Sequence, residues 1–183
     1  MLLSISDNAM FNERTDEMAT TAAKIVGPAD GKSGQLPSIG VRFMVGAAES
    51  GGGFSLVEHP MAPRMLAAPL HRHSREDEYS YVLEGRMGAL LGDEVVYAEA
   101  GDLVFKPRDQ WHTFWNAGDE PARILEIISP GGFEGYFDEL VDLPPGPPDL
   151  GLLAGMAERY GLEFDFESIP GLVERFGLEF PAA

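Results

Sequence analysis

The most regular part of the chain is a series of short apolar or alternating segments between about residues 38 and 130. Gly, Pro, Asp or Asn separates each segment from the next, and the segments are IGVRFMV, FSLVEH, RMLAAPL, EYSYVLEG, RMGALLG, EVVYAEA, DLVFKP, WHTFWNA and ARILEIIS. Alternation with a period of two is typical of β-strands that bury one face. Many short strands with closely spaced turn residues are typical of antiparallel sandwiches and barrels. The pattern therefore predicts an all-β, antiparallel domain over residues 38–130.

The pattern changes after Pro130, where apolar residues recur at helical spacing. Segments with this spacing are FEGYFDELVDL, DLGLLAGMAERYGLEFDF and SIPGLVERFGLEF, and the Pro-rich run PPGPP interrupts them. This spacing predicts a helical C-terminal extension over residues 131–183. Two arrangements are open at this stage: the extension covers a cavity of the barrel, or it packs outside and contributes to dimerisation.

Residues 1–37 are polar and weakly patterned, which predicts a partly disordered N-terminal arm. The segment Gly27–Ser33, GPADGKS, resembles a phosphate-binding loop, but only three residues separate its glycines where that loop needs four. We therefore interpret it as a Gly-containing linker.

The charge and residue composition narrow the possible partners and cofactors. Thirty acidic against thirteen basic residues give a formal charge of −17. Such a surface repels phosphates and anionic lipid, so neither nucleic acid nor a membrane is an expected partner. No apolar run approaches the ~20 residues of a membrane span, and no secretory signal is evident, so the expected location is the cytoplasm. Because the sequence has no cysteine, any metal must be held by His, Asp or Glu.

The segment HRHSREDEYSYVLEG, which begins at His71, contains candidate metal ligands. In a strand, residues i and i+2 point to the same side, so His71 and His73 project together. Glu78 lies at an odd separation and would face away on a continuous strand. The polar run 74–77 suits a turn, however, and a new strand beginning at Glu78 could return its side chain to the histidines. We interpret the competing carboxylates, Glu76 and Asp77, as solvated turn residues.

A complete site would need another imidazole from a distant segment, and His59 and His112 are the remaining histidines. On a strand over 111–116, His112, Phe114 and Asn116 share one face. His112 could therefore point into an aromatic-lined cavity, or it could be a half-buried core histidine.

Together these segments resemble the two sequence motifs of the cupin superfamily. The first motif, His-x-His-x4-Glu-x6-Gly, is matched by His71, His73, Glu78 and Gly85. The second, Gly-x5-Pro-x-Gly-x2-His-x3-Asn, is matched by Gly101, Pro107, His112 and Asn116. Two turn positions depart from the pattern, with Met65 and Asp109 where the motifs have Gly. The resemblance covers residues 38–130 and implies an antiparallel double-sheet jelly-roll barrel with a metal inside its mouth.

The resemblance also implies the ligands and a range of functions. The implied metal ligands are His71, His73, Glu78 and His112. Their nitrogen and oxygen donors suit one divalent ion, which could be Fe, Mn, Ni, Co or Zn. The first functional hypothesis is a quercetinase-like, single-domain dioxygenase that acts on a small enolic or aromatic, flavonol-like substrate. In that hypothesis Glu78 is catalytic, as a ligand or as a general base.

The expected pocket residues are Phe43, Phe54, Ser80, Phe114 and Asn116. Two alternatives to the dioxygenase stay open: a redox-neutral, metal-assisted isomerase or lyase, and a small-molecule-binding cupin without catalysis. The resemblance further implies a homodimer. Because cupins span all these classes, the fold alone does not choose among them.

Overall fold

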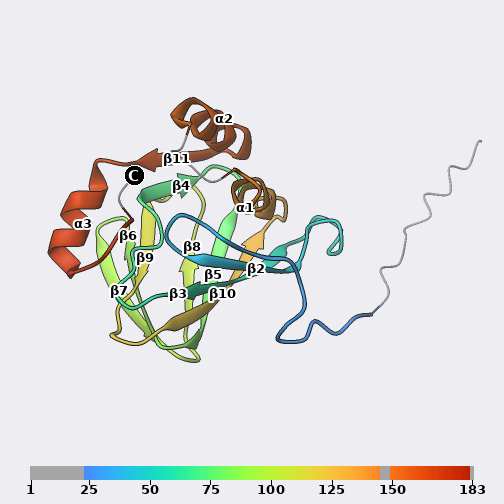
Figure 1. The fold of residues 1–183 in the computed structure, drawn as a ribbon, viewed down its shortest axis with the longest axis horizontal. Coiled ribbons are helices and arrows are strands. Elements are labelled where there is room, and N and C mark those ends of the chain that lie inside the picture. The colour runs from blue at the N-terminus through green and yellow to red at the C-terminus, as the bar shows by residue number, and fades with distance from the viewer. Residues whose placement is uncertain (1–22, 145–148, 182–183) are drawn as a thin grey trace, which may run out of the picture.

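The computed structural model describes residues 23–144 and 149–181, which form two antiparallel β-sheets with helices at one side (Figure 1). The first sheet has six strands in the order β1-β2-β3-β10-β5-β8, and the second has five in the order β11-β4-β9-β6-β7. This arrangement confirms the predicted antiparallel double-sheet, jelly-roll architecture.

Eight of the nine predicted apolar segments contain a strand, whereas RMLAAPL lies between β3 and β4 except for its last residue. Those of the first sheet are β1 (Ser33–Gln35), β2 (Gly40–Val45), β3 (Ser55–Met61), β10 (Ala122–Ser129), β5 (Asp77–Glu84) and β8 (Leu103–Lys106). Those of the second are β11 (Leu162–Asp165), β4 (Leu70–His73), β9 (His112–Asn116), β6 (Arg86–Leu91) and β7 (Glu94–Glu99). Burial alternates along β4 and along most of β5 and β10, as the period of two predicts.

The turn between β5 and β6 shows why the first motif ends in glycine. Gly85 has a φ of 79°, and a Cβ on it would meet the Cβ of Ala122 at 2.7 Å. Only a residue without a side chain fits both the conformation and the space. At Asp109, where the second motif departs from glycine, the backbone keeps the same left-handed conformation with a φ of 63°. Asp tolerates this region better than most residues do.

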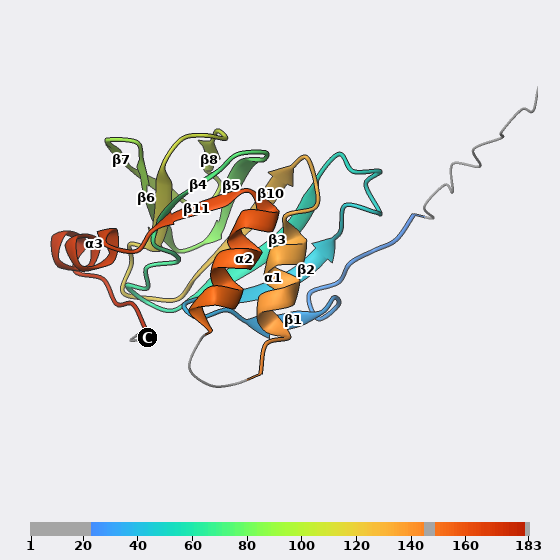
Figure 2. The ribbon, with the colours of Figure 1, turned by 90° about the horizontal axis from the view of Figure 1, so that it is seen from above.

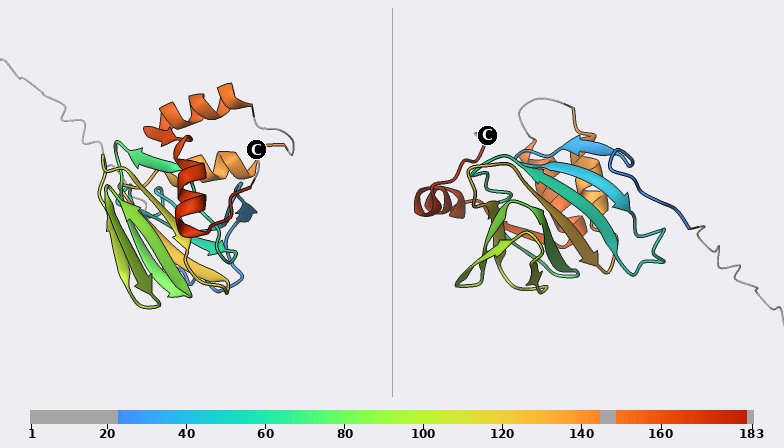
Figure 3. Two further views of the ribbon diagram at one scale, coloured as in Figure 1. Left: turned by 90° about the vertical axis from the view of Figure 1, so that its left-hand side faces the viewer. Right: turned by 90° about the horizontal axis from the view of Figure 1, so that it is seen from below.

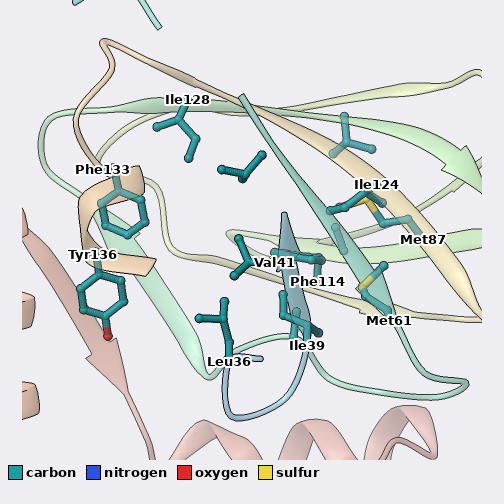
Figure 4. Close-up of a cluster of buried hydrophobic side chains, with 14 of the residues drawn as sticks. Leu36, Ile39, Val41, Met61, Met87, Phe114, Ile124, Ile128, Phe133 and Tyr136 are labelled. Carbon is teal, nitrogen blue, oxygen red and sulfur yellow. The ribbon is translucent and has the colours of Figure 1, made fainter. Parts of the chain in front are cut away.

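Apolar side chains fill the space between the two sheets, as the close-up shows (Figure 4). Ile124 and Ile128 of β10 and Met87 of β6 are almost completely buried there. Burying one such side chain stabilises the fold by about 1.5–3 kcal/mol. The cluster continues into Phe133 and Tyr136, which lie beyond the strands (Figure 4), so the core includes part of the C-terminal extension.

The extension contains three helices: α1 (Glu134–Val141), α2 (Leu150–Tyr160) and α3 (Ser168–Phe176). Helices α1 and α2 lie side by side, with α1 over β2 and β3 (Figure 2). Helix α3 lies apart from them (Figure 3) and covers the outer face of the five-stranded sheet, where Phe176 stacks on Trp115 at 4.4 Å. One part of the extension therefore continues the core and another part packs outside, while a contribution to dimerisation stays a prediction.

The sequence pattern did not predict β11, which falls within a segment of helical spacing. Gly161 ends α2 in a left-handed conformation, with a φ of 66°, and the chain then pairs with β4. The similar segment after α3 behaves the same way: Gly177 has a φ of 63°, and Glu179 then forms a bridge with Met65. Both copies of the Gly-Leu-Glu-Phe sequence thus end a helix and continue as extended chain.

The predicted N-terminal arm is only partly within the described residues. Residues 1–22 lie outside them, as does 145–148 in the Pro-rich run. The arm also contains β1, which pairs with β2, so the six-stranded sheet begins five residues before the predicted domain boundary at 38. No helix in the two described ranges is long and apolar enough to cross a membrane.

Candidate metal centre

The structure brings the four predicted ligands into one buried cluster. Strand β4 supplies His71 and His73, β5 supplies Glu78, and β9 supplies His112; the ligand atoms all lie within 4.8 Å of one another. Between His71 and His73, Arg72 points to the other side and pairs with Glu163 at 2.8 Å. The chain turns after His73, and β5 begins at Asp77, so the turn returns Glu78 to the face that carries the histidines.

Backbone carbonyl groups orient two of the three imidazoles. Nδ1 of His71 lies 2.8 Å from the carbonyl oxygen of Pro69, and Nδ1 of His112 lies 3.0 Å from that of Gln110. Because a carbonyl oxygen can only accept, Nδ1 carries the proton in both rings, and Nε2 keeps its lone pair. A protein histidine that binds a metal usually has such a partner on its other nitrogen.

The interior of the cluster lacks the donors that its acceptors need. Nε2 of His112 faces Oε2 of Glu78 at 3.2 Å, so two lone pairs meet unless a proton or a metal ion intervenes. His73 is 1% exposed, and neither of its ring nitrogens has a hydrogen-bond partner among the described residues. A buried polar atom without a partner is unfavourable. The donor set and these unsatisfied atoms fit a divalent metal ion.

The protonation states also suit metal binding. Burial lowers the pKa of His73 to about 4, and burial together with His112 and His73 holds the pKa of His71 well below its ordinary value. Both rings are therefore neutral at physiological pH, which is the form that binds metals. Burial alone would raise the pKa of Glu78, but the charge of Lys106 and the contacts with the histidines outweigh it and lower that pKa.

The prediction that Glu76 is a solvated turn residue is wrong. Glu76 is 7% exposed, its Oε2 lies 3.8 Å from Nδ1 of His73, and burial raises the pKa of its carboxyl to about 7. The turn folds back over β4 and so takes the Glu76 side chain inward. Asp77 behaves differently, because it pairs with Arg108 at 2.8 Å near the surface.

A cavity of about 130 Å³ lies against the histidines and is lined mainly by apolar side chains. One water needs only ~10–15 Å³, so the cavity has room for a small organic molecule. Much of its aromatic lining comes from the C-terminal extension: Phe133, Tyr136 and Phe137 in and before α1, and Phe164 on β11. The Phe133 ring meets the His73 ring edge-on at 4.3 Å, and Phe164 lies 5.8 Å from His71.

Of the five predicted pocket residues, Phe114 lines this cavity. Phe43 contributes to a different depression, beside Lys24 and Glu49, and Phe54 is 40% exposed. Ser80 and Asn116 are buried but bonded elsewhere: Ser80 to Glu126, and the Asn116 amide to backbone oxygens of Met61, Ala62 and Glu120. Asn116 therefore fixes the loops at the far end of β9.

Sequence reasoning missed two buried charged residues on the six-stranded sheet, Lys106 and Glu126. The ammonium of Lys106 lies 2.8 Å from Glu78 and 3.1 Å from Glu126, and Ser80 donates a 2.7 Å hydrogen bond to Glu126. Burial and the charge of Glu78 raise the pKa of Glu126 to about 7 against the opposing effect of Lys106. The pattern of β10 could have indicated Glu126. It stands at every second position with Ile124 and Ile128, so it must face the interior with them.

Comparisons with known proteins agree with the antiparallel double-sheet, jelly-roll fold. Residues 58–128 match the family model described as the cupin domain. It is 37% identical over 60 residues to the tetracenomycin polyketide synthase protein TcmJ of Streptomyces glaucescens, and 38% identical over 60 residues to the polyketide synthase CurC of Streptomyces cyaneus. Each match covers 33% of this chain, and the chain spans 40% and 39% of the length of these relatives.

Solved structures show the same fold. The polyketide cyclase RemF from Streptomyces resistomycificus is 28% identical with a TM-score of 0.51, over 59% of this chain and 80% of the other. KdgF from Halomonas sp. has a TM-score of 0.55 over 62% of this chain and 99% of the other. At 16% identity, KdgF supports the fold alone.

Proposed function

We propose that the protein is a metal-dependent enzyme that catalyses a redox-neutral cyclisation or dehydration of a small enolisable compound of aromatic polyketide type. The observation that carries this proposal is the cluster of three histidines and Glu78, of which His71, His73 and Glu78 line an aromatic-rich cavity. The matches to proteins whose names state polyketide synthase or polyketide cyclase support this class of substrate.

The described residues suggest how such a reaction would be supported. A divalent ion held by His71, His73, Glu78 and His112 would act as a Lewis acid toward a substrate carbonyl oxygen. The apolar lining excludes water and strengthens electrostatic interactions inside. Rings such as Phe133 and Phe164 offer surfaces for a planar ring beside the histidines. Oε2 of Glu78 already bonds Lys106, which favours its role as a fixed ligand over that of a mobile base.

The second candidate is the quercetinase-like dioxygenase. Three imidazoles and one carboxylate suit iron, manganese or nickel as well as zinc, and a metal held by them would supply the chemistry for oxygen and an enolic substrate. A non-catalytic binding protein is the third outcome that the experiments must separate.

The test uses protein purified without chelators or nickel columns, with its metal measured by elemental analysis. The probe for cyclisation is 1-phenylhexane-1,3,5-trione, which closes to a pyranone with loss of one water. We expect metal-dependent pyranone formation without oxygen, and none with His112→Ala. Oxygen consumption with quercetin, together with no anaerobic conversion of the triketone, would establish the dioxygenase instead.

The homodimer stays a prediction that light scattering of the purified chain can check.

If metal-loaded protein binds both probes and converts neither, the binding role replaces the proposed enzyme.

A further inference from the structure

The cavity has a second polar wall, on the six-stranded sheet, that the proposed mechanism does not use. We propose that Glu126 and His59 on this wall form a subsite that binds a hydroxyl group of the substrate while the metal holds a different oxygen. This inference rests on the proposed function and makes its substrate more specific. We call these two residues the acceptor wall.

Glu126 presents an unpaired acceptor. Its side chain is 2% exposed and belongs to the lining of the cavity. Its Oε2 accepts hydrogen bonds from Ser80 and Lys106, whereas its Oε1 has no partner among the described residues. Buried carboxylate oxygens are rarely left unpaired, so a donor from a bound molecule would complete this one. A carboxyl group can bond a hydroxyl in either protonation state, so the subsite does not depend on which is present.

Lys106 does not compete for the same ligand. Its ammonium contacts Glu78, Glu126 and the face of the Phe114 ring, 4.6 Å away. An ammonium has three N–H donors, and the space around this one is taken up by Glu78, Glu126 and Phe114. Lys106 therefore fixes Glu126 in place, and the substrate meets the carboxyl oxygen rather than the cation.

His59 adds a second acceptor on the neighbouring strand. It lines the cavity, and its Nδ1 lies 2.9 Å from the carbonyl oxygen of Gly40. The carbonyl fixes the proton on Nδ1, which puts the lone pair on Nε2. Glu126 pairs with Val57 across the two strands, so His59 is its diagonal neighbour on the same face. Such neighbours lie about 7–8 Å apart, within the span of one small aromatic molecule.

These two residues predict a polarity for the substrate. At the histidines, a metal takes a carbonyl or enol oxygen; at the acceptor wall, the residues need a donor. A phenolic or alcoholic hydroxyl can donate to Nε2 of His59 or to the Glu126 carboxylate, whereas an ether or ketone oxygen has no proton to donate to either of these acceptors. The favoured substrate is therefore a hydroxylated β-dicarbonyl or polyphenol rather than its O-methylated form.

The experiment measures binding of matched probes to metal-loaded protein by the ultraviolet absorption of the diketone. The probes are 1-(hydroxyphenyl)butane-1,3-diones with the hydroxyl at the ortho, meta or para position, each beside its methoxy counterpart. For at least one position, we expect wild type to bind the hydroxyl probe about tenfold more tightly than the methoxy probe, as one added hydrogen bond predicts.

Glu126→Gln is expected to abolish or reverse that preference. Ser80 and Lys106 would both donate to the amide oxygen of Gln, which leaves its NH2 group at the former Oε1 position. A donor then replaces an acceptor, and it favours the methoxy oxygen. Glu58→Gln is the matched control: Glu58 lies next to His59 but pairs with Arg42 and Arg123, so the preference should persist.

Metal content is measured in every variant, so that a changed metal site is not mistaken for a changed subsite. If Glu126→Gln does not fold, Glu126→Asp retains the charge but withdraws the carboxylate, and it should also lose the hydroxyl preference. Metal-dependent binding without any preference, or with a preference that survives both variants, would overturn the subsite and leave the proposed function standing. Absence of metal-dependent binding to every probe would overturn both.

Discussion

The two polar walls of the cavity are built by different means. The histidine wall is the cluster of His71, His73 and His112, of which His71 and His73 line the cavity, and two of its rings are oriented by the carbonyl two residues earlier in the chain. On the acceptor wall, Glu126 is held by side chains of two other strands, Ser80 and Lys106. Local backbone therefore orients two of the metal ligands, whereas side chains distant in sequence hold Glu126 in place. The first kind of site leaves a motif in the sequence, and the second does not.

The largest expected effect comes from removing the charge of Lys106, which holds Glu126 of the acceptor wall in place. Lys106→Met leaves Glu78 and Glu126 as buried carboxylates without a cation, so the free energy of unfolding should fall by about 3–5 kcal/mol. Urea denaturation at pH 7 measures it. Lys32→Met is the matched control, since Lys32 also bridges two carboxylates, Asp138 and Asp142, but at the surface. The control should lose much less stability than Lys106→Met, and equal losses would contradict the comparison.

The affinity for metal should depend on His112, on the histidine wall, and not on His59, on the acceptor wall. His112→Ala removes a ligand, and we expect metal to bind more than about 100-fold more weakly, because loss of partners outside the ligand set alone costs 10–100-fold. His59→Gln, on the acceptor wall, should leave affinity almost unchanged. Competition titration with a chromogenic chelator measures both. Loss of metal from His59→Gln would show that the walls do not act separately.

The pH dependence of the metal-free protein should report the acceptor wall. Burial lowers the pKa of His59 from 6.5 to about 4, so between these values the unfolded chain binds the proton and the folded chain does not. Stability therefore falls as the pH falls through this window, by about 1.4 kcal/mol per pH unit for this residue. His59→Gln should flatten the dependence by that amount in urea titrations from pH 7 to 4. An unchanged slope would show that His59 titrates normally.

Glu126 has the opposite effect on the pH dependence of stability in part of this pH range. Its pKa is raised from 4.5 to about 7, so its contribution to stability is lost as the pH rises through this window. The double variant with Glu126→Gln should therefore show a steeper dependence on pH than His59→Gln alone.

The smallest effect concerns the histidine without a carbonyl partner. Glu76 lies near Nδ1 of His73 and stands where the other two rings have backbone oxygens. Glu76→Gln should weaken metal binding about tenfold, which is the lower end for a residue that orients a ligand. Asp77→Asn, which changes an ion pair with Arg108 nearer the surface, is the control. Equal affinities in the two variants would exclude an orienting role for Glu76.

The sequence was sufficient for the features that depend on local geometry. Alternation predicted the antiparallel sheets, and the turn after His73 explained how Glu78 could rejoin His71. The same reasoning misplaced Glu76, because the direction in which a turn folds is set by tertiary packing and not by its polarity. It also could not find most of the pocket, since Phe133 and Phe164 approach the histidines only through contacts distant in sequence. Strand β11 was missed because Gly161 stops a helix without revealing which strand the chain will join.

The pairing of β11 with β4 has a consequence for the order of folding. Strand β4 has one residue pair with β9, between His71 and His112, but four consecutive pairs with β11. Its most extensive neighbour is thus made about 90 residues later, as the separation of 91 between Arg72 and Glu163 illustrates. Contacts between such distant segments form slowly. During synthesis the earlier segment cannot make them until the later segment has been synthesised. On the ribosome, the strand that carries two of the ligands therefore has an open edge until residues 162–165 have emerged.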